Sequence, residues 1–281
     1  MRSKHSRRSA RALLAIVLAL AAIVVCLPIL WWVSFALSDS ASLEPGGSLL
    51  DVWLPDGFHL VENVRTALDL YPFDRFFVNS LVVASVVTVA DVFLSALAGY
   101  AFAKLEFRGR DLLFALVISL LMVPQIVLVV PLFELAVELG VTNTYWALVL
   151  PFLVSPLGVF LMRQFMLSIP DAYIESARSE GAGELRIFAT IALPLARNAL
   201  LTLAIFTFLL QWDSLLWPLI AVNDQSHFTL PVGVSLLQTN VQVPYNAIYA
   251  ITLVVSLPMM LLYVIFQRQF MRSVALAGIR G

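Results

Sequence analysis

Residues 12–37 read ALLAIVLALAAIVVCLPILWWVSFAL, a run without a charged side chain that lies between Arg11 and Asp39. As a helix rising about 1.5 Å per residue, it is long enough to cross the roughly 30 Å hydrocarbon core of a bilayer. A basic N-terminus precedes it, as in a signal peptide, but the apolar core of a signal peptide has only about 7–15 residues. The run therefore predicts a membrane span that is retained in the protein.

The composition of the whole chain points to the same class. Of 281 residues, 61% are hydrophobic and 12% are charged, and the mean hydropathy is +0.93. Soluble domains are about 45–50% apolar and about 25% charged, and disordered chains are rich in charge. The net charge of −1 gives no electrostatic footprint for nucleic acid, and a single cysteine excludes a disulfide scaffold. We therefore expect a polytopic membrane protein with lipid around it and no nucleic acid partner.

Runs with few charges predict six transmembrane helices. Their approximate bounds are 12–37, 77–103, 112–136, 145–167, 196–220 and 247–269. Helices are expected because lipid offers no partner for exposed backbone groups, and runs that are apolar on all sides do not suit the alternating strands of a barrel. The predicted fold class is an all-α polytopic membrane protein.

Lysine and arginine predict the orientation of these helices. Fifteen of the 17 basic residues fall on the side of the two termini, and only Arg65 and Arg75 fall on the other. The positive-inside rule then places both termini in the cytoplasm, opposite an acidic segment over 38–75. The predicted division is a cytoplasmic N-tail (1–11), the first helix with its outer loop (12–75), a core of five helices (76–270) and a cytoplasmic C-tail (271–281).

Signatures of catalysis and of metal binding are missing from the sequence. The only lysines, Lys4 and Lys104, follow Ser3 and Ala103, so no phosphate-binding loop of the type G-x-x-x-x-G-K-[ST] exists. The three histidines lack metal-ligand spacing, and no G-x-S-x-G elbow is present. We expect a transport protein with no metal and no cofactor of its own. An ATP-independent channel or secondary transporter, and a membrane enzyme, are the alternative classes.

The segment 168–194 between the fourth and fifth helices reads SIPDAYIESARSEGAGELRIFATIALP. Ser168, Pro170 and Asp171 are typical of a helix start capped by the serine, and Gly181 is typical of a helix end. We expect a short helix to about Glu180, followed by a second helical stretch. Charged residues beside small ones suit contact with a partner protein, and the alternative is a connector that lies on the membrane surface.

The same segment resembles the EAA loop of ABC-importer permeases, through Glu175-Ser176-Ala177, Gly181-Ala182 and Ile191-x-Leu193-Pro194. The resemblance extends over roughly residues 75 to 281 and is closest to the carbohydrate-import branch, which includes the second permease subunit of the maltose importer. Further segments that carry it are 98–105, 107–110, 143–146, 161–165, 229–233 and 267–270.

Three positions depart from the family pattern. Ser176 replaces the middle alanine of the loop, and Glu180 stands where aspartate is usual. The fifth helix reads Trp212-Asp213-Ser214 where the family commonly shows Trp-Asn-Asp/Glu. The acid has therefore moved by one residue, about 100° around a helix.

The resemblance implies a type I importer permease in the bacterial cytoplasmic membrane. It would pair with a homologous second permease subunit, two cytoplasmic ATPase subunits that hold ATP and Mg, and an extracytoplasmic substrate-binding protein. The segment 168–194 would couple the pathway to an ATPase. The coupling residues it implies are Glu175, Ser176, Ala177, Arg178, Glu180, Gly181, Ala182, Leu193 and Pro194.

Two further sets of residues are functional candidates. The polar and aromatic residues of the spans either line the pathway or serve packing and helix–helix hydrogen bonds; they are Asp91, Trp212, Asp213 and Trp217. Polar residues of the loop before the last helix either contact the binding protein or are simply solvated; they are Asn223, Asp224, Gln225, Gln238 and Asn240. Span interiors without lysine or arginine favour a neutral sugar or oligosaccharide as substrate, and glycerol phosphate or another polyol derivative is the alternative.

Overall fold

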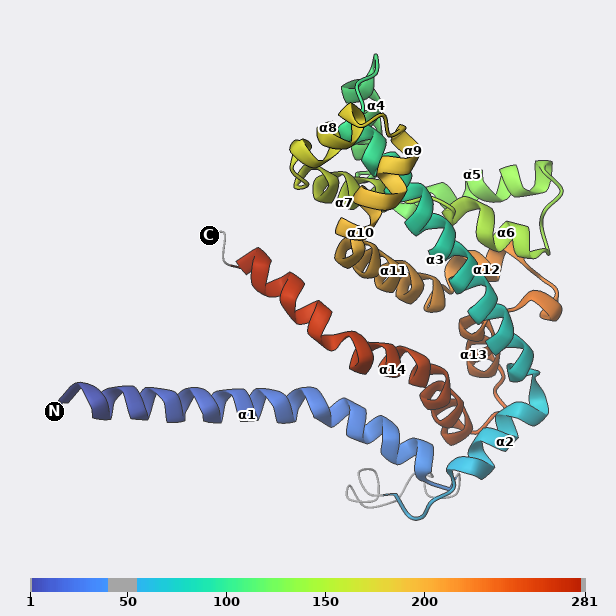
Figure 1. Cartoon of the computed structure of the whole chain (residues 1–281). Helices are drawn as coiled ribbons and strands as arrows, with labels where there is room; N and C mark the ends of the chain where they lie inside the picture. The colour runs from blue at the N-terminus through green and yellow to red at the C-terminus, as the bar shows by residue number, and fades with distance from the viewer. Residues whose placement is uncertain (1, 40–54, 279–281) are drawn as a thin grey trace. The chain divides into compact units, whose positions relative to one another are not determined.

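The computed structural model describes the backbone of residues 2–39 and 55–278, and the side chains of residues 13–39 and 55–267. Within these residues every regular element is a helix, which confirms the all-α class (Figure 1). Glu44 and Asp51 of the predicted outer loop, and the basic side chains of both predicted tails, lie outside the described side chains.

The longer helices, of nine residues or more, are α1 (Arg2–Leu37), α2 (Leu60–Leu70), α3 (Phe73–Lys104), α4 (Arg110–Leu120), α5 (Gln125–Glu138), α7 (Pro156–Leu167), α8 (Asp171–Ser179), α11 (Arg197–Trp212), α13 (Leu230–Thr239) and α14 (Tyr245–Gly278). The shorter ones are α6 (Tyr145–Val149), η2 (Leu150–Phe152), α9 (Glu184–Ile187), η3 (Phe188–Ala192), α10 (Leu193–Leu195), α12 (Leu216–Ala221) and η4 (Gln225–His227).

Three helices of the described chain are long and apolar enough to span a membrane unbroken, within α1, α3 and α14. Three further candidates are bent pairs, so the count reaches six if each pair is one span. The bends are 102° between α4 and α5, 40° between the Tyr145–Phe152 stretch and α7, and 79° between the Glu184–Leu195 stretch and α11. The count is therefore consistent with the six predicted spans, although three of them are bent. The predicted helix 196–220 is also split, into α11 and α12.

Proline explains two of the breaks. Pro124 lies just before α5 in an extended conformation, with φ −61° and ψ 129°, so α4 cannot run on through it. Pro156 begins α7, the position at which its missing N–H costs nothing. Ser155 caps that helix by accepting a hydrogen bond from Gly158 N at 2.9 Å.

The chain forms two compact units, which are described separately. The first combines α1 and α2 with residues 234–257, and its centre is polar. Asn63 Nδ2 donates to the carbonyls of Ala36 and Ser38, at 3.0 and 2.9 Å. Asn246 Nδ2 donates to Ser38 O at 3.2 Å and to Asn63 Oδ1 at 2.7 Å. These two amides therefore satisfy carbonyls that the end of α1 leaves without helical partners.

The second unit contains residues 74–233, and α3 packs very closely against α7 within it. A Cβ atom at Gly99 would lie 2.7 Å from Arg163 N and 2.7 Å from Met162 Cβ. A Cβ atom at Gly158 would lie 2.5 Å from Ser95 Oγ. Small residues thus bring the two helices into backbone contact, as is usual between membrane helices.

Asp91 joins three helices at this contact. Its side chain is completely buried. Oδ1 accepts from Ser95 Oγ at 2.9 Å and from Ser155 N at 2.7 Å, and Oδ2 accepts from Ser155 Oγ at 3.1 Å and from Thr207 Oγ1 at 2.7 Å. Because Ser155 caps α7 and Thr207 lies on α11, the carboxylate links both helices to α3. This geometry favours the structural interpretation of Asp91, since the side chain has no surface left for a substrate in this conformation.

We expect Asp91→Ala to destabilise the protein strongly. The change leaves four donor groups without their acceptor, the hydroxyls of Ser95, Ser155 and Thr207 and the N–H of Ser155, each costing about 1–3 kcal/mol. Thermal unfolding of the purified protein in detergent measures the effect, and Thr207→Val, which removes one bond of the four, is the matched control. A melting temperature for Asp91→Ala at or above that of Thr207→Val would contradict this role.

We expect Gly99→Ala to weaken the contact between α3 and α7. The added Cβ meets backbone at 2.7 Å, so the helices must separate, and overpacking of this kind costs about 1–3 kcal/mol. Gly183→Ala is the control, because a Cβ there meets nothing within 4 Å. The same unfolding assay should show a loss for the first variant and none for the second, and equal stabilities would refute the close packing.

Candidate functional site

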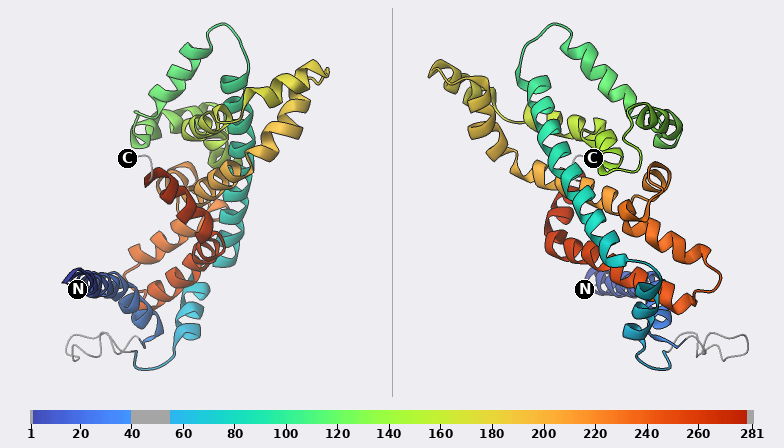
Figure 2. Two further views of the ribbon diagram at one scale, coloured as in Figure 1. Left: turned by 60° about the vertical axis from the view of Figure 1, so that its left-hand side comes forward. Right: turned by 90° about the vertical axis from the view of Figure 1, so that its right-hand side faces the viewer.

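Residues 168–194 form a helical hairpin at the end of α3, and we call α8, the turn 180–183 and α9 the coupling hairpin (Figure 2). The predicted short helix is confirmed, because α8 ends at Ser179. Gly181 has a left-handed φ of 83°, and the N–H of Ala182 bonds to Ala177 O at 3.0 Å. A left-handed glycine at this position ends a helix without steric cost.

The predicted cap of this helix is wrong. Ser168 belongs to the end of α7, where its hydroxyl donates to Phe165 O at 2.7 Å. The residue before α8 is Pro170, whose side chain cannot accept a hydrogen bond from the helix. Ser168 lies two residues before the cap position, at the end of the preceding helix, and no side chain caps α8.

An apolar face holds the coupling hairpin against the helices that carry it. Ile174 of α8, Ile187 of α9 and Phe188 are buried together with Tyr100 and Met162. The rings of Tyr100 and Phe188 have centroids 5.4 Å apart. Burial of this face stabilises the hairpin in one orientation, with its charged face outward.

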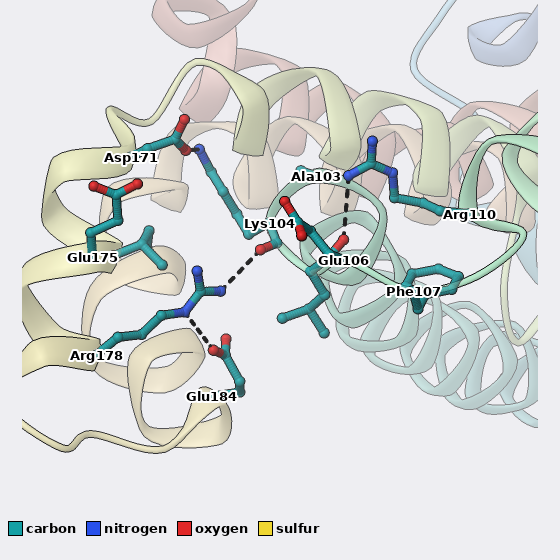
Figure 3. Close-up of a pocket in the computed structure, with 11 residues that line it drawn as sticks. Ala103, Lys104, Glu106, Phe107, Arg110, Asp171, Glu175, Arg178 and Glu184 are labelled. Atoms are coloured by element: carbon teal, nitrogen blue, oxygen red, sulfur yellow. Dashed lines mark hydrogen bonds and ion pairs between the residues drawn. The ribbon is translucent and has the colours of Figure 1, made fainter.

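Polar contacts fix the hairpin to the last turn of α3 (Figure 3). Lys104 Nζ donates to Ile169 O at 2.6 Å and pairs with Asp171 Oδ1 at 2.5 Å. Arg178 Nη2 donates to Lys104 O at 3.0 Å, and its Nε pairs with Glu184 Oε1 at 2.7 Å. The hydrogen bond from Lys104 holds the pKa of Asp171 below its ordinary value, and the bond to Glu184 raises the pKa of Arg178.

An open depression of about 640 Å³ lies between the coupling hairpin and residues 103–110. Its walls are the end of α3, the loop that follows it and one side of α8 (Figure 3). Arg110 lies on the far wall, where Nη1 donates to Leu105 O at 3.4 Å. The depression is therefore charged and faces solvent beside α8.

Most of the predicted coupling residues gather on this hairpin. Glu175, Ser176, Arg178, Glu180 and Gly181 are exposed. The half-buried members of the set are Ala177, Ala182 and Leu193, and Pro194 is exposed beyond the hairpin on α10. The arrangement offers a partner protein a small, charged surface, and the coupling role of these residues stays a prediction.

The predicted pathway residues do not share one surface. Trp212 is 2% exposed, with its ring 5.6 Å from that of Phe208, and Trp217 is 5% exposed, with Nε1 donating to Ala147 O at 2.9 Å. Both rings are packed inside the second unit, so neither offers a face to a sugar in this conformation. Asp213, at the break between α11 and α12, is exposed.

The predicted outer contacts divide into two groups. Asn223, Asp224 and Gln225 are exposed in the loop after α12, whereas Gln238 is exposed at the end of α13 and Asn240 is half-buried beyond it. The two groups belong to different compact units. Their common role in contacting a binding protein stays a prediction.

Asn143 holds the first group in place. It has a left-handed φ of 57°, and its Oδ1 accepts from Asn223 N at 2.5 Å and from Asp224 N at 3.3 Å. Asp224 in turn accepts from the backbone and the hydroxyl of Ser226, and these bonds lower its pKa.

Asn79 near the start of α3 supports the same loop. Its Nδ2 donates to the carbonyls of Ser226 and Phe228, at 2.9 and 2.8 Å. Tyr145 completes the support with a hydrogen bond to Asn79 Oδ1 at 2.6 Å. The loop 223–228 is therefore anchored from two sides.

Sequence reasoning missed these supports, and it missed Tyr100 and Lys104 as partners of the hairpin. Lys104 is one of two lysines in the chain and falls in the family-like segment 98–105, but neither observation assigned it a partner. An isolated lysine at the end of a long apolar helix was the available signal. Its partners lie more than 60 residues away, so spacing alone does not reveal them.

Comparisons with known proteins agree with this geometry. The family model described as "Binding-protein-dependent transport system inner membrane component" matches residues 75–275. The arabinooligosaccharides transport system permease protein AraQ of Halalkalibacterium halodurans is 33% identical over 269 residues, which are 96% of each chain. The sn-glycerol-3-phosphate transport system permease protein UgpE of Brucella abortus is 31% identical over 268 residues, 92% of this chain and 93% of the relative.

A solved structure shares the fold. It is that of a bacterial ABC transporter involved in the import of the acidic polysaccharide alginate, with a TM-score of 0.83 at 21% identity, and the match covers 94% of this chain and 97% of that one. The matched residues 75–275 include the helices from α4 to α13 and the hairpin between α7 and α10. The chain belongs to the binding-protein-dependent transport system inner membrane components, the permeases of ABC importers.

Proposed function

We propose that this chain is one of two permease subunits of an ATP-driven importer for a sugar or oligosaccharide. The observation that carries the proposal is the coupling hairpin, which presents exposed charges beside a left-handed Gly181 and is fixed to α3 by buried and charged contacts. A homologous second permease would complete the pathway. Two ATPase subunits, holding ATP and Mg, would receive one hairpin each on the cytoplasmic side.

Relatives support a carbohydrate substrate. AraQ is named for arabinooligosaccharides and is 33% identical over 96% of this chain. The predicted span interiors carry no lysine or arginine, and Lys104 at the end of α3 is engaged with Ile169 O and Asp171. A phosphorylated cargo would favour free cations along the path, so a neutral sugar suits this chain better.

Glycerol phosphate is the second candidate, because a relative named for it is 31% identical over 92% of this chain. The complex is purified from its native membrane and the captured binding protein is tested with arabinooligosaccharides and with sn-glycerol-3-phosphate. Tight binding of the phosphate alone would replace the sugar assignment. Uptake by the purified chain without any ATPase would instead overturn the importer proposal.

We expect Gly181→Pro and Glu175→Lys to uncouple ATP hydrolysis from uptake. Proline fixes φ near −65° and lacks the N–H that Gly181 donates to Arg178 O at 3.0 Å, so the turn of the hairpin cannot form. Glu175→Lys reverses an exposed charge on α8. In liposomes containing the whole complex, substrate-stimulated ATPase activity should fall in both variants, with Gly183→Ala as control. Normal substrate stimulation of the ATPase activity in both variants would contradict the coupling role of the hairpin.

We expect Asn143→Gly to weaken docking of the binding protein. Glycine keeps the left-handed backbone but removes the acceptor of two N–H groups in the loop 223–228, a loss of about 1 kcal/mol per hydrogen bond. The concentration of binding protein that gives half-maximal ATPase stimulation should rise. Asn143→Asp keeps the acceptor and is the matched control. Equal half-maximal concentrations for the two variants would show that the loop 223–228 takes no part in docking of the binding protein.

A further inference from the structure

One residue of α3, Lys104, is bonded to both ends of α8. Its ammonium reaches Ile169 O and Asp171 at the start of the helix, and its side chain is only 4% exposed. Its carbonyl accepts from Arg178 Nη2 at 3.0 Å, in the last turn of the helix. The whole of α8 is therefore bridged by a single residue that is more than 60 positions away in the sequence.

A second tie lies one turn earlier on α3. Tyr100 OH donates to Glu184 Oε2 at 2.7 Å, and Arg178 Nε pairs with the other oxygen of the same carboxylate. Tyr100 is 2% exposed and precedes Lys104 by four residues, so both side chains leave the same face of α3. The last turn of α3 thus holds α8 and α9 together.

The position of Lys104 is fixed by energetics as well as by geometry. A buried ammonium is costly unless it is paired, and here it has both a carboxylate and a carbonyl. Ile169 lies just beyond the end of α7, where the negative end of the helix dipole favours a cation. The ammonium therefore has one favourable position, beside Ile169 O and Asp171. It stays bound to these two groups when the hairpin moves.

We propose that Lys104 is a positioning residue that makes α3 and the coupling hairpin move as one body. The hairpin is continuous in the chain with α7 and α11, whereas α3 joins it through these polar contacts and through apolar packing around Tyr100. The hydrogen bonds of Lys104 and Tyr100 make α3 follow a displacement of the hairpin. The hydrogen bonds of Asp91 then transmit the motion of α3 to α7 and α11 within the membrane. The inference rests on the proposed function, since an ATPase must drive the hairpin.

The first test is the ratio of substrate transported to ATP hydrolysed by the whole complex in liposomes. Lys104→Met keeps the apolar stem and removes the charge, and the ratio should fall about tenfold, as expected when charge-assisted hydrogen bonds are lost. Lys104→Arg should restore most of the ratio, because a guanidinium still donates to both partners. Arg110→Met is the matched control, since it removes a cation from the same depression without touching the hairpin.

Asp171→Asn provides a second variant that leaves packing intact, because Asp171 is 73% exposed. It weakens one of the bonds of Lys104, so its ratio should lie between those of the wild type and Lys104→Met. Wild-type ratios in both Lys104→Met and Asp171→Asn overturn the inference, as does an equal loss in Arg110→Met. A wild-type complex that neither hydrolyses ATP nor transports sugar would instead refute the proposed function.

The second test measures the shared motion directly. Spin labels are placed in a Cys26→Ser background at two exposed positions of the second unit, Val89 on α3 and Tyr173 on α8. The distance between the labels should be the same in the nucleotide-free and ATP-trapped complex, and it should differ between these states in Lys104→Met. A distance that changes with nucleotide in the unmutated background refutes the common motion.

Discussion

Lipid offers no hydrogen-bond partner to a polypeptide, so each break in a membrane helix must be satisfied from within the protein. The second unit contains several such breaks and helix ends, and a polar side chain bonds to the backbone near three of them. Asp91 accepts the N–H of Ser155 where α7 begins. Lys104 donates to the carbonyl of Ile169 after α7 ends, and Trp217 donates to that of Ala147 in the last turn of α6.

The unbroken helix α3 supplies most of these side chains. From its first turns to its last residue, Asn79, Ser80, Asp91, Tyr100 and Lys104 each bond to a different segment of the second unit. Polar side chains would be costly on a helix that faces lipid. On α3 they are instead hydrogen-bonded to the broken helices around it. The irregular helices depend on the regular one, which explains why α3 carries both buried polar groups and glycine contacts.

The breaks themselves could not be predicted from the length of the apolar runs. Pro28, Pro131 and Pro258 lie inside continuous helices, whereas Pro124 and Pro156 stand where helices are interrupted. The residue type is the same in both cases. What differs is whether neighbouring groups satisfy the backbone that proline frees, and those neighbours, such as Asp91, come from distant parts of the sequence. The coupling hairpin was predictable because its helix end and its turn are local features.

Two acidic residues of the predicted spans, Asp91 and Asp213, show the same contrast between local pattern and distant partners. Their sequence surroundings are alike, since each stands alone in an apolar run. Asp91 is completely buried and has all its hydrogen bonds within the chain. Asp213 is exposed at the break between α11 and α12, and no side chain of the described residues donates to it. A carboxylate at membrane depth is costly unless it is hydrated or paired. Of the four predicted pathway residues, Asp91, Trp212 and Trp217 are therefore held by contacts within the chain, and Asp213 is the one that is exposed.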